Sequence, residues 1–161
     1  MRLRSYALPA ILLALPAQPV AAQTAHGAAT GAAILVVHVD KTVAGGILRL
    51  GLYDAAGYPD DNAKPVASAD VPAQAGRTSV TLTGLAPGTY AIQAYQDRNS
   101  NGKMDSSWLG LPLEPYGFSR DAAPRLSKPG FDRVKFDLAA GQNSQTFSLQ
   151  NTGSLQNTGG R

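Results

Sequence analysis

Apolar and polar residues alternate with a period close to two along most of the chain, and no stretch keeps the apolar stripe of a helix. In Ile47–Tyr53, for example, Leu48, Leu50 and Leu52 share one face, and Arg49 falls on the other. Short segments of this kind, separated by Gly, Pro, Asp and Asn turns, are Ile34–Asp40, Ile47–Tyr53, Val66–Val71, Thr78–Leu82, Tyr90–Tyr95, Arg133–Leu138 and Thr146–Leu149. They predict an all-β domain, a seven-stranded antiparallel β-sandwich.

Two connections refine this fold. Val66–Val71 lies between Pro65 and Pro72, which predicts an edge strand because proline cannot donate a hydrogen bond to a neighbouring strand. Leu85–Tyr90 reads L-x-P-G-x-Y and predicts that Tyr90 buries its ring and returns its hydroxyl to the backbone, as in the tyrosine corner. The pattern resembles that of transthyretin-like and immunoglobulin-like modules, including fibronectin type III repeats.

One connection is far longer than the others. About 30 residues, Asn99–Gly130, separate the fifth and sixth predicted strands, beyond the length at which loops without structure are common. The segment contains Trp108, Tyr116 and Phe118, which is too apolar for disorder. We therefore expect a long ordered loop that folds back on the sandwich as a lobe.

The first residues have the three-part layout of a secretory signal peptide. Arg2 and Arg4 supply the basic start, Ser5–Ala17 the apolar run, and Val20–Ala22 the small residues before a cut near Ala22. The apolar run is too short to cross a bilayer, and we expect no membrane span in the mature chain. The sequence predicts export, either to the periplasm or as a secreted protein.

These features divide the chain into four parts. Residues 1–22 form the predicted signal peptide, 23–33 a flexible lead, 34–150 the β-sandwich domain and 151–161 a flexible tail. The tail carries S-L-Q-N-T-G in two tandem copies, of which the first begins inside the last strand. Two copies are too few for a solenoid, and we assign them no function.

Composition excludes several classes of function. The chain has no Cys, which excludes disulfides, thiolate chemistry and cysteine-ligated zinc. Its 14 Lys and Arg stand against 11 Asp and Glu, with no concentrated basic face, so we expect no nucleic acid as partner. Neither a G-x-S-x-G nucleophile elbow nor a glycine-rich phosphate loop is present, and we assign no catalytic residue.

The beginning of the long connection carries a candidate metal site. It reads D-R-N-S-N-G-K-M-D and matches most of the calcium-loop pattern D-x-[DN]-x-[DN]-G. The candidate ligands are Asp97, Asn99, Asn101, Lys103 through its backbone carbonyl, and Asp105. Trp108 stands where a bidentate Glu would close the shell, so the pattern predicts at most a weak calcium site. The alternative is a series of Asx turns that requires no metal.

The order of the strands indicates which other carboxylates lie near Asp97. In an up-and-down run, the connection after the fifth strand shares its end with those after the first and third. Asp40 and Asp70 are therefore expected closer to Asp97 than Asp60 is. Glu114, the only glutamate in the chain, and Asp121 are further candidates to complete the shell.

The same stretch carries a family resemblance. Asp97–Asp105 reads D-x-N-x-N-G-K-x-D, and Gly110–Ser119 reads G-x-P-x-E-x-Y-G-F-S. With Lys128–Phe136 also similar, the chain resembles, over roughly Ile34–Leu149, a family of bacterial secreted proteins known as domain of unknown function 2141. It departs from that family at Arg120-Asp121, where two Asn are typical. The resemblance implies export and a β-sandwich, and it implies no particular activity.

The aromatic residues of the loop allow two interpretations: a stacking platform for a sugar or peptide, or a small core of the loop itself. The candidate ligand-binding residues are Trp108, Glu114, Tyr116 and Phe118. The sequence predicts an exported, non-catalytic binding or accessory module of the cell envelope, with an envelope protein or a glycan as partner and calcium as the one candidate cofactor. The alternative is a carbohydrate-active enzyme or a sugar-binding module that uses Glu114 and the loop aromatics.

Overall fold

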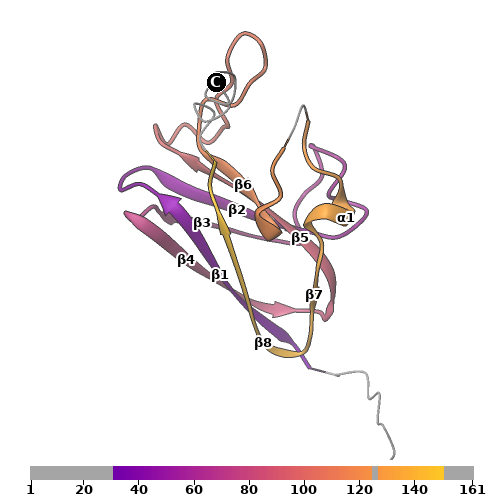
Figure 1. The fold of residues 1–161 in the computed structure, drawn as a ribbon. Coiled ribbons are helices and arrows are strands. Elements are labelled where there is room, and N and C mark those ends of the chain that lie inside the picture. The colour runs from indigo at the N-terminus through magenta and orange to yellow at the C-terminus, as the bar shows by residue number, and fades with distance from the viewer. Residues whose placement is uncertain (1–30, 125–126, 151–161) are drawn as a thin grey trace, which may run out of the picture.

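A computed structural model describes residues 31–124 and 127–150, which form two β-sheets (Figure 1). The predicted signal peptide, residues 23–30 of the predicted lead, and the tail lie outside the described residues. The strands in the described part are β1 (Ala33–Thr42), β2 (Ile47–Tyr53), β3 (Ala67–Pro72), β4 (Gly76–Leu85), β5 (Gly88–Asp97), β6 (Tyr116–Phe118), β7 (Phe136–Leu138) and β8 (Gly141–Ser148). Two helical turns, η1 (Ser119–Asp121) and α1 (Phe131–Val134), lie between β6 and β7. No helix in the described ranges is long and apolar enough to cross a membrane.

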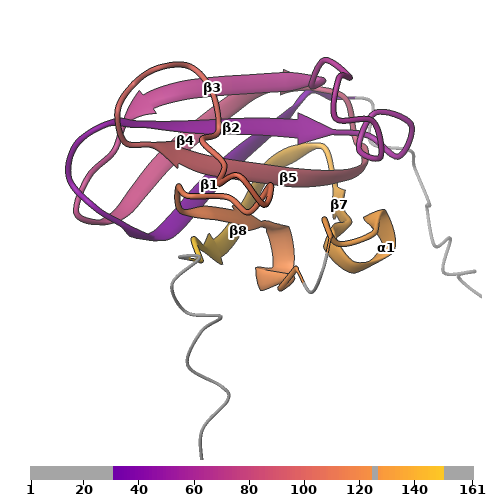
Figure 2. The ribbon, with the colours of Figure 1, turned by 90° about the horizontal axis from the view of Figure 1, so that it is seen from above.

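The first sheet has the order β4-β1-β8, and the second has the order β3-β2-β5-β6, with β7 beside the start of β5. Figure 2 shows β3, β2 and β5 side by side in the second sheet. One apolar cluster joins the inner faces of both sheets, with Leu35 and Val37 from β1 packed in the same core as Leu48 and Leu52 from β2. Successive side chains of a strand point to opposite faces, so the alternation seen in the sequence gives each sheet one buried side.

The all-β class is confirmed, but the strands differ from the prediction in number and direction. The described residues contain eight strands instead of seven, because Tyr116–Phe118 forms β6 inside the long connection. A strand of three residues is too short to be recognised from the alternation of apolar and polar positions. The predicted strand at Arg133–Leu138 begins only at Phe136, since Val134 ends α1.

The prediction that all strands are antiparallel is also wrong. β8 pairs with β1 in parallel, from Ala33 opposite Gly141 to Asp40 opposite Ser148. The alternation of apolar residues specifies the face that a strand buries and leaves the direction of its neighbour open. The connection from β1 to β8 contains every other strand, which is long enough for the crossover that a parallel pair requires.

Two of the predicted details are confirmed. β3 lies at the edge of the second sheet, as its flanking prolines indicated. Tyr90 is 8% exposed, and its hydroxyl donates a hydrogen bond of 3.0 Å to the carbonyl of Ala86. This bond ties the tight turn before β5 to the core and so fixes where the strand begins.

The long connection is ordered where it is described, and its second half covers the outer face of the second sheet. Phe118 and Val134 pack there with Tyr58 and Ala91 in a second, smaller core. The buried hydroxyl of Ser119 accepts a hydrogen bond from the Ile92 backbone N–H at 3.0 Å, and it donates one to the carbonyl of Val134 at 2.6 Å. Ser119 therefore holds β5 and α1 together through one side chain.

The tyrosine corner can be tested by replacing Tyr90 with Phe, which keeps the ring and removes only the hydroxyl. We expect the free energy of unfolding to fall by about 1 kcal/mol, the usual net contribution of one such hydrogen bond, as measured by urea unfolding. Tyr95→Phe is the matched control, because the ring of Tyr95 lies on the outer face of the sheet. It should lower the free energy of unfolding by less than Tyr90→Phe does. An unfolding midpoint unchanged in Tyr90→Phe would contradict a stabilising role for the corner.

Candidate functional site

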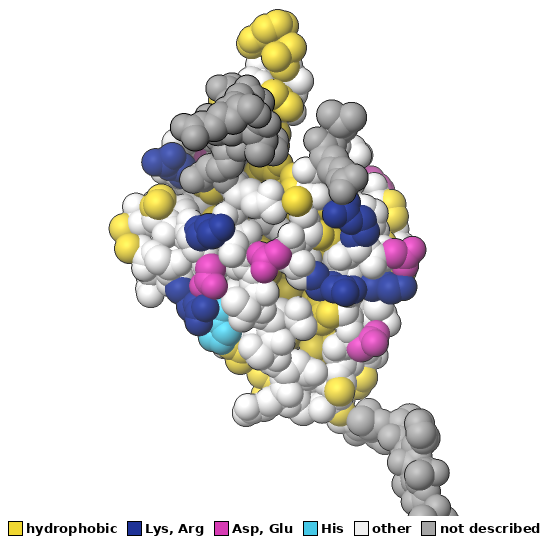
Figure 3. All heavy atoms as spheres, viewed as in Figure 1, with side chains coloured by type: hydrophobic (Ala, Val, Ile, Leu, Met, Phe, Trp, Pro, Cys, Tyr) yellow, Lys and Arg dark blue, Asp and Glu magenta, His cyan; other side chains and the backbone are white. Residues whose placement is uncertain are grey.

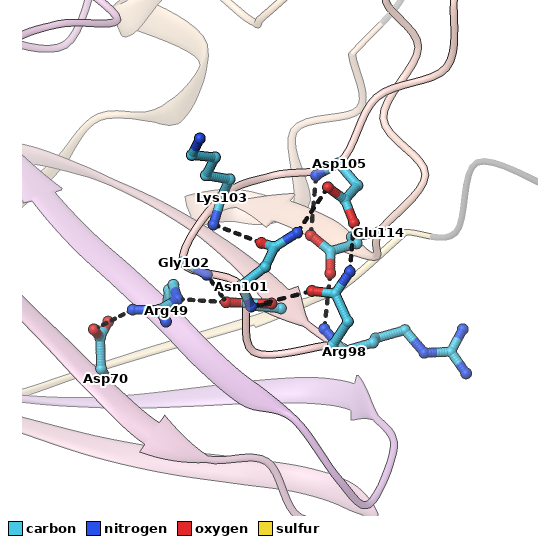
Figure 4. A network of polar contacts seen from close by, with 10 residues as sticks. Arg49, Asp70, Arg98, Asn101, Gly102, Lys103, Asp105 and Glu114 are labelled. Carbon is cyan, nitrogen blue, oxygen red and sulfur yellow. Dashed lines mark hydrogen bonds and ion pairs between the residues drawn. The ribbon is translucent and has the colours of Figure 1, made fainter.

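Asp97 ends β5 with a fully buried side chain, 0% exposed. The neighbouring strand β2 supplies its partner, because the Nε of Arg49 donates to Asp97 Oδ2 at 2.8 Å. A second nitrogen of Arg49 donates to the carboxylate of Asp70 on β3, so that one guanidinium bridges two carboxylates (Figure 4). A buried carboxylate is costly unless it is paired, and Arg49 provides that pairing.

The expectation that Asp70 lies near Asp97 is confirmed, and the nearness of Asp40 stays a prediction. Asp70 shares Arg49 with Asp97, whereas Asp40 pairs with Arg77 across β1 and β4. The reason is register: Arg77 stands directly opposite Asp40 in the first sheet.

Residues 99–103 fold around the carboxylate of Asp97. The backbone N–H of Asn101 donates to Asp97 Oδ1 at 3.1 Å, and that of Gly102 donates to Oδ2 at 2.8 Å. The N–H of Asn101 also reaches the side-chain oxygen of Asn99, and the N–H of Lys103 reaches that of Asn101. Gly102 has φ of +81°, a conformation that glycine adopts without strain.

Asp105 and Glu114 close the base of this loop. The side-chain amides of Asn99 and Asn101 donate to the two oxygens of Asp105 at 2.7 and 2.9 Å. Glu114 is 4% exposed and accepts the backbone N–H groups of Arg98 at 2.8 Å and Asp105 at 3.2 Å. The only glutamate of the chain thus clamps the two ends of the turn together.

The structure brings the predicted metal ligands into one network, and hydrogen bonds within the loop account for their arrangement. Lys103 contributes its N–H to that network, and the amide nitrogens of Asn99 and Asn101 face Asp105. No group of three or more His, Cys, Asp or Glu side chains that could hold an ion occurs in the part of the chain that the structure describes. This geometry is that of the Asx-turn interpretation, and calcium binding stays a prediction.

The surroundings of Asp97 also change its acidity. Burial alone would raise the pKa of Asp97, but the hydrogen bonds from Arg49, Gly102 and Asn101 outweigh burial and hold the pKa below its ordinary value of 3.8. The folded protein therefore favours the ionised carboxylate more than the unfolded chain does. Asp97 stabilises the fold at a pH above the ordinary value of its pKa.

A groove of about 720 Å³ lies over the outer face of the second sheet. Its floor is formed by four strands, chiefly by residues on their outward faces: Arg49, Gly51 and Tyr53 of β2, Ser68 and Asp70 of β3, Gln93 and Tyr95 of β5, and Tyr116 and Phe118 of β6; Leu50 of β2 and Ala94 of β5 also border it. Residues 104 and 110–112 of the long connection also line it, and so do Asp61, Pro65, Pro124, Ser127 and Lys128. The long connection therefore builds part of the groove as well as the loop network.

The charges that line the groove are paired with one another. Arg49 pairs with Asp70, and Lys128 pairs with Asp61. Lys128 also donates to the carbonyl of Tyr58 at 2.8 Å, and its Nζ lies 5.0 Å from the centroid of the Tyr58 ring. Between these pairs the groove presents four aromatic rings, the polar side chains of Ser68, Gln93 and Ser127, and aliphatic side chains, among them Met104, Leu111 and three prolines.

The aromatic floor is continuous across neighbouring strands. Tyr95 stands opposite Tyr116 in register, and the rings of Tyr116 and Phe118 meet edge to face with centroids 5.9 Å apart. Burial raises the pKa values of Tyr95 and Tyr116, so both phenols are protonated and neutral at physiological pH. They can donate and accept hydrogen bonds without carrying charge.

The structure separates the predicted ligand-binding residues. Tyr116 and Phe118 lie on the groove floor, Glu114 lies buried in the loop network, and Trp108 is 91% exposed in the turn where the N–H of Gly110 donates to the carbonyl of Ser107. Sequence reasoning missed Tyr53 and Lys128 as groove residues. Tyr53 could have been found, since it shares the outward face of β2 with Arg49; Lys128 gave no signal, because only the folding back of its segment brings it there.

The contribution of the ionised Asp97 side chain to stability can be tested with Asp97→Asn, which removes the charge and keeps the size and shape of the side chain. We expect a lower unfolding midpoint at neutral pH, since the lowered folded pKa contributes stability above about pH 4. That contribution is lost as the pH falls below 3.8 and through the folded pKa, so the difference from wild type should shrink there. Urea unfolding at neutral pH and at about pH 3 measures both.

Asp70→Asn is the matched control, because Asp70 is the exposed partner of the same arginine and exposed pairs contribute little. The lowered pKa values of Asp40 and Asp132 act in every variant alike and cancel in the comparison. A difference between wild type and Asp97→Asn that is as large at low pH as at neutral pH would refute the assigned role of the charge.

The comparisons with known proteins agree with the motifs of the loop. A family whose description reads "Uncharacterized protein conserved in bacteria (DUF2141)" matches residues 37–146, which is more than half of the chain. The match spans β1 to β8 and includes both the loop network and the groove floor. The resemblance drawn from the sequence is thereby confirmed. No curated protein and no solved structure matches.

Proposed function

The chain belongs to the DUF2141 family of bacterial proteins, and we propose that it is an exported, non-catalytic binding module whose groove takes a neutral glycan of the cell envelope. Its scaffold in this proposal is a sandwich of the transthyretin-like or immunoglobulin-like type. Export is supported by the basic, apolar and small-residue segments of residues 1–22. The observation that carries the proposal is the groove on the outer face of the second sheet.

The size and lining of the groove suit a small ligand. Its volume of about 720 Å³ falls within the range of roughly 300–1,000 Å³ that is common for ligand sites. Tyr53, Tyr95, Tyr116 and Phe118 offer ring faces and edges on which the C–H face of a sugar ring can pack. Gln93 and Ser68 add side chains that can exchange hydrogen bonds with sugar hydroxyls.

The pairing of charges supports a neutral ligand. A charged ligand in the groove would have to compete with Asp70 for Arg49, or with Asp61 for Lys128. A neutral ligand leaves both pairs intact and gains from the apolar floor. A glycan meets this requirement while offering many hydroxyls, and an extended uncharged peptide is the other outcome that the test below distinguishes.

The state of the carboxylates supports binding over catalysis. A glycosidase needs two carboxyl groups, one of them protonated, on either side of the scissile bond. Asp61 and Asp70 are each held in an ion pair, with Lys128 and with Arg49, so neither carboxylate is free of a partner in the groove. Glu114, the residue that the enzyme alternative requires, accepts two backbone N–H groups beneath the loop and does not line the groove.

The proposal predicts saturable binding of neutral oligosaccharides, tested with tetramers of glucose and of N-acetylglucosamine by calorimetric titration. Tyr116→Ala should weaken the affinity about tenfold, as the loss of one aromatic contact implies. Tyr116→Phe keeps the ring and should keep most of the affinity. Because the ligand carries no charge, the affinity should change little with salt concentration.

Trp108→Ala is the matched control, since Trp108 lies on the same long connection but does not line the groove. It should bind these sugars as the wild type does. Saturable binding of uncharged peptides alone would replace the glycan with a peptide ligand. Absence of binding to both probes, or an equal loss in Trp108→Ala, would overturn the groove as the site.

Calcium binding by the loop is tested separately, by thermal melting with millimolar calcium and with a chelator. Because the oxygens of the loop already accept hydrogen bonds and Arg49 already balances Asp97, we expect the same midpoint in both. If an ion is bound, calcium at tenfold its dissociation constant would raise the free energy of unfolding by about 1.4 kcal/mol. Such a rise, absent with magnesium and in Asp105→Asn, would establish the calcium interpretation.

A further inference from the structure

The first half of the long connection ends in a narrow hairpin that exposes large apolar side chains. The four that project are Trp108 at 91% exposure, Leu109 at 62%, Leu111 at 54% and Leu113 at 60%. The connection that carries them is the hairpin that projects at the top of Figure 1, and in the same view Figure 3 shows apolar side chains on the projection at the top of the molecule. We call residues 106–113 the apolar finger. Exposed apolar surface gathered on one projection is typical of an interaction site.

The finger is held in a defined shape. The N–H of Ser107 donates to the carbonyl of Leu111 at 2.8 Å, and the N–H of Leu113 donates to that of Asp105 at 2.8 Å. Gly110 turns the tip with φ of +75°, and its N–H donates to the carbonyl of Ser107. Glu114 anchors the base through Asp105. The apolar side chains are therefore presented to solvent in advance, and no folding step is needed to expose them.

Two cations stand at the base of the finger and face outward. Figure 4 shows the side chains of Arg98 and Lys103 extending away from the loop network, and both are exposed. Neither takes part in an ion pair of the described residues. The carboxylates of Asp97 and Glu114 are buried and turned inward.

We propose that the apolar finger inserts into the interfacial region of a lipid bilayer, with Arg98 and Lys103 at the level of anionic headgroups. The shape of the finger favours this occupant. Its large exposed apolar side chains are four in number and project from a single hairpin, whereas a stable protein interface draws on roughly 20–30 residues of each partner. A bilayer surrounds an inserted projection on all sides, and Trp is enriched at its interface.

This inference goes beyond the glycan-binding function and does not rest on it. The tip residues Trp108 and Leu109 do not line the groove. Gly110, Leu111 and Pro112 of the finger do line it, so substitutions at the tip are the ones that remove lipid binding without changing the groove. Docking by the finger would hold the module at a membrane surface without any membrane-spanning segment.

The test uses Trp108 as its reporter, because it is the only tryptophan of the chain. The protein is the chain without residues 1–22, which retains every described element, since the described residues begin at 31. We expect its tryptophan emission to shift to the blue with phosphatidylcholine vesicles that contain phosphatidylglycerol, and less with phosphatidylcholine alone. Leu109→Ser, which keeps the reporter, should weaken partitioning about tenfold or more.

The role of Arg98 and Lys103 is tested by a second measurement, of binding to anionic vesicles. Arg98→Gln and Lys103→Gln should each weaken binding to the anionic vesicles about fivefold, from roughly 1 kcal/mol per basic residue at such a surface. Val66→Ser and Lys64→Gln are the matched controls, since both residues are exposed and lie in the segment between β2 and β3. Vesicle sedimentation measures all variants, and equal melting midpoints verify that each is folded.

Three results would overturn the proposal. One is the absence of a blue shift with either kind of vesicle. Another is an equal partition of wild type and Leu109→Ser. The third is a blue shift that grows with protein concentration in the absence of lipid, which would assign the finger to a second copy of the chain.

Discussion

The buried carboxylate of Asp97 is the constraint on which the upper end of the molecule depends. It sits at the end of β5, inaccessible to water, and it requires hydrogen bonds from every side. Arg49 meets this requirement from the neighbouring strand, and the turn that follows meets it with two backbone N–H groups. The connection between β1 and β2 packs so closely here that a Cβ on Gly46 would lie 2.3 Å from the Asp97 carbonyl oxygen.

The shape of the long connection follows from that turn. Once residues 99–103 are wound around Asp97, Asp105 is brought back beside the base of the loop, where Glu114 can bond both ends. Glu114 then sets where the chain leaves the loop and enters β6, through Pro115 bonded to the N–H of Gln96. A carboxylate at the end of a strand thereby determines the direction of the apolar finger and the position of the aromatic rings of β6.

The long connection contributes to two surfaces of different character, the groove and the apolar finger. The groove gathers rings from β2, β5 and β6, one charge pair from strands and one from connections, which produces a site whose lining charges balance. The finger carries apolar side chains away from the core, where nothing in the described residues covers them. In the proposed function the two features work together, because a protein docked at a surface samples ligands near that surface more often than a free one.

Several features were determined by the sequence itself. Leu48, Leu50 and Leu52 assign β2 an inner face by their spacing alone, and the P-G turn places Tyr90 against Ala86 four residues away. The D-x-N-x-N-G run likewise predicts its turn, whether or not an ion is present, since each Asx side chain bonds a backbone group within five residues. These features share a cause: the interacting groups are close in sequence, so the local pattern contains the whole interaction.

Only the tertiary structure decided the rest. The parallel pairing of β8 with β1, the identity of Glu114 as a clamp, and the meeting of Tyr53 with Lys128 at one groove all join residues far apart in the chain. An alternating pattern tells which face of a strand is apolar, and it holds no information about the neighbour or its direction. Those choices depend on which apolar faces can be buried together and which charges can be paired once the sheets have formed.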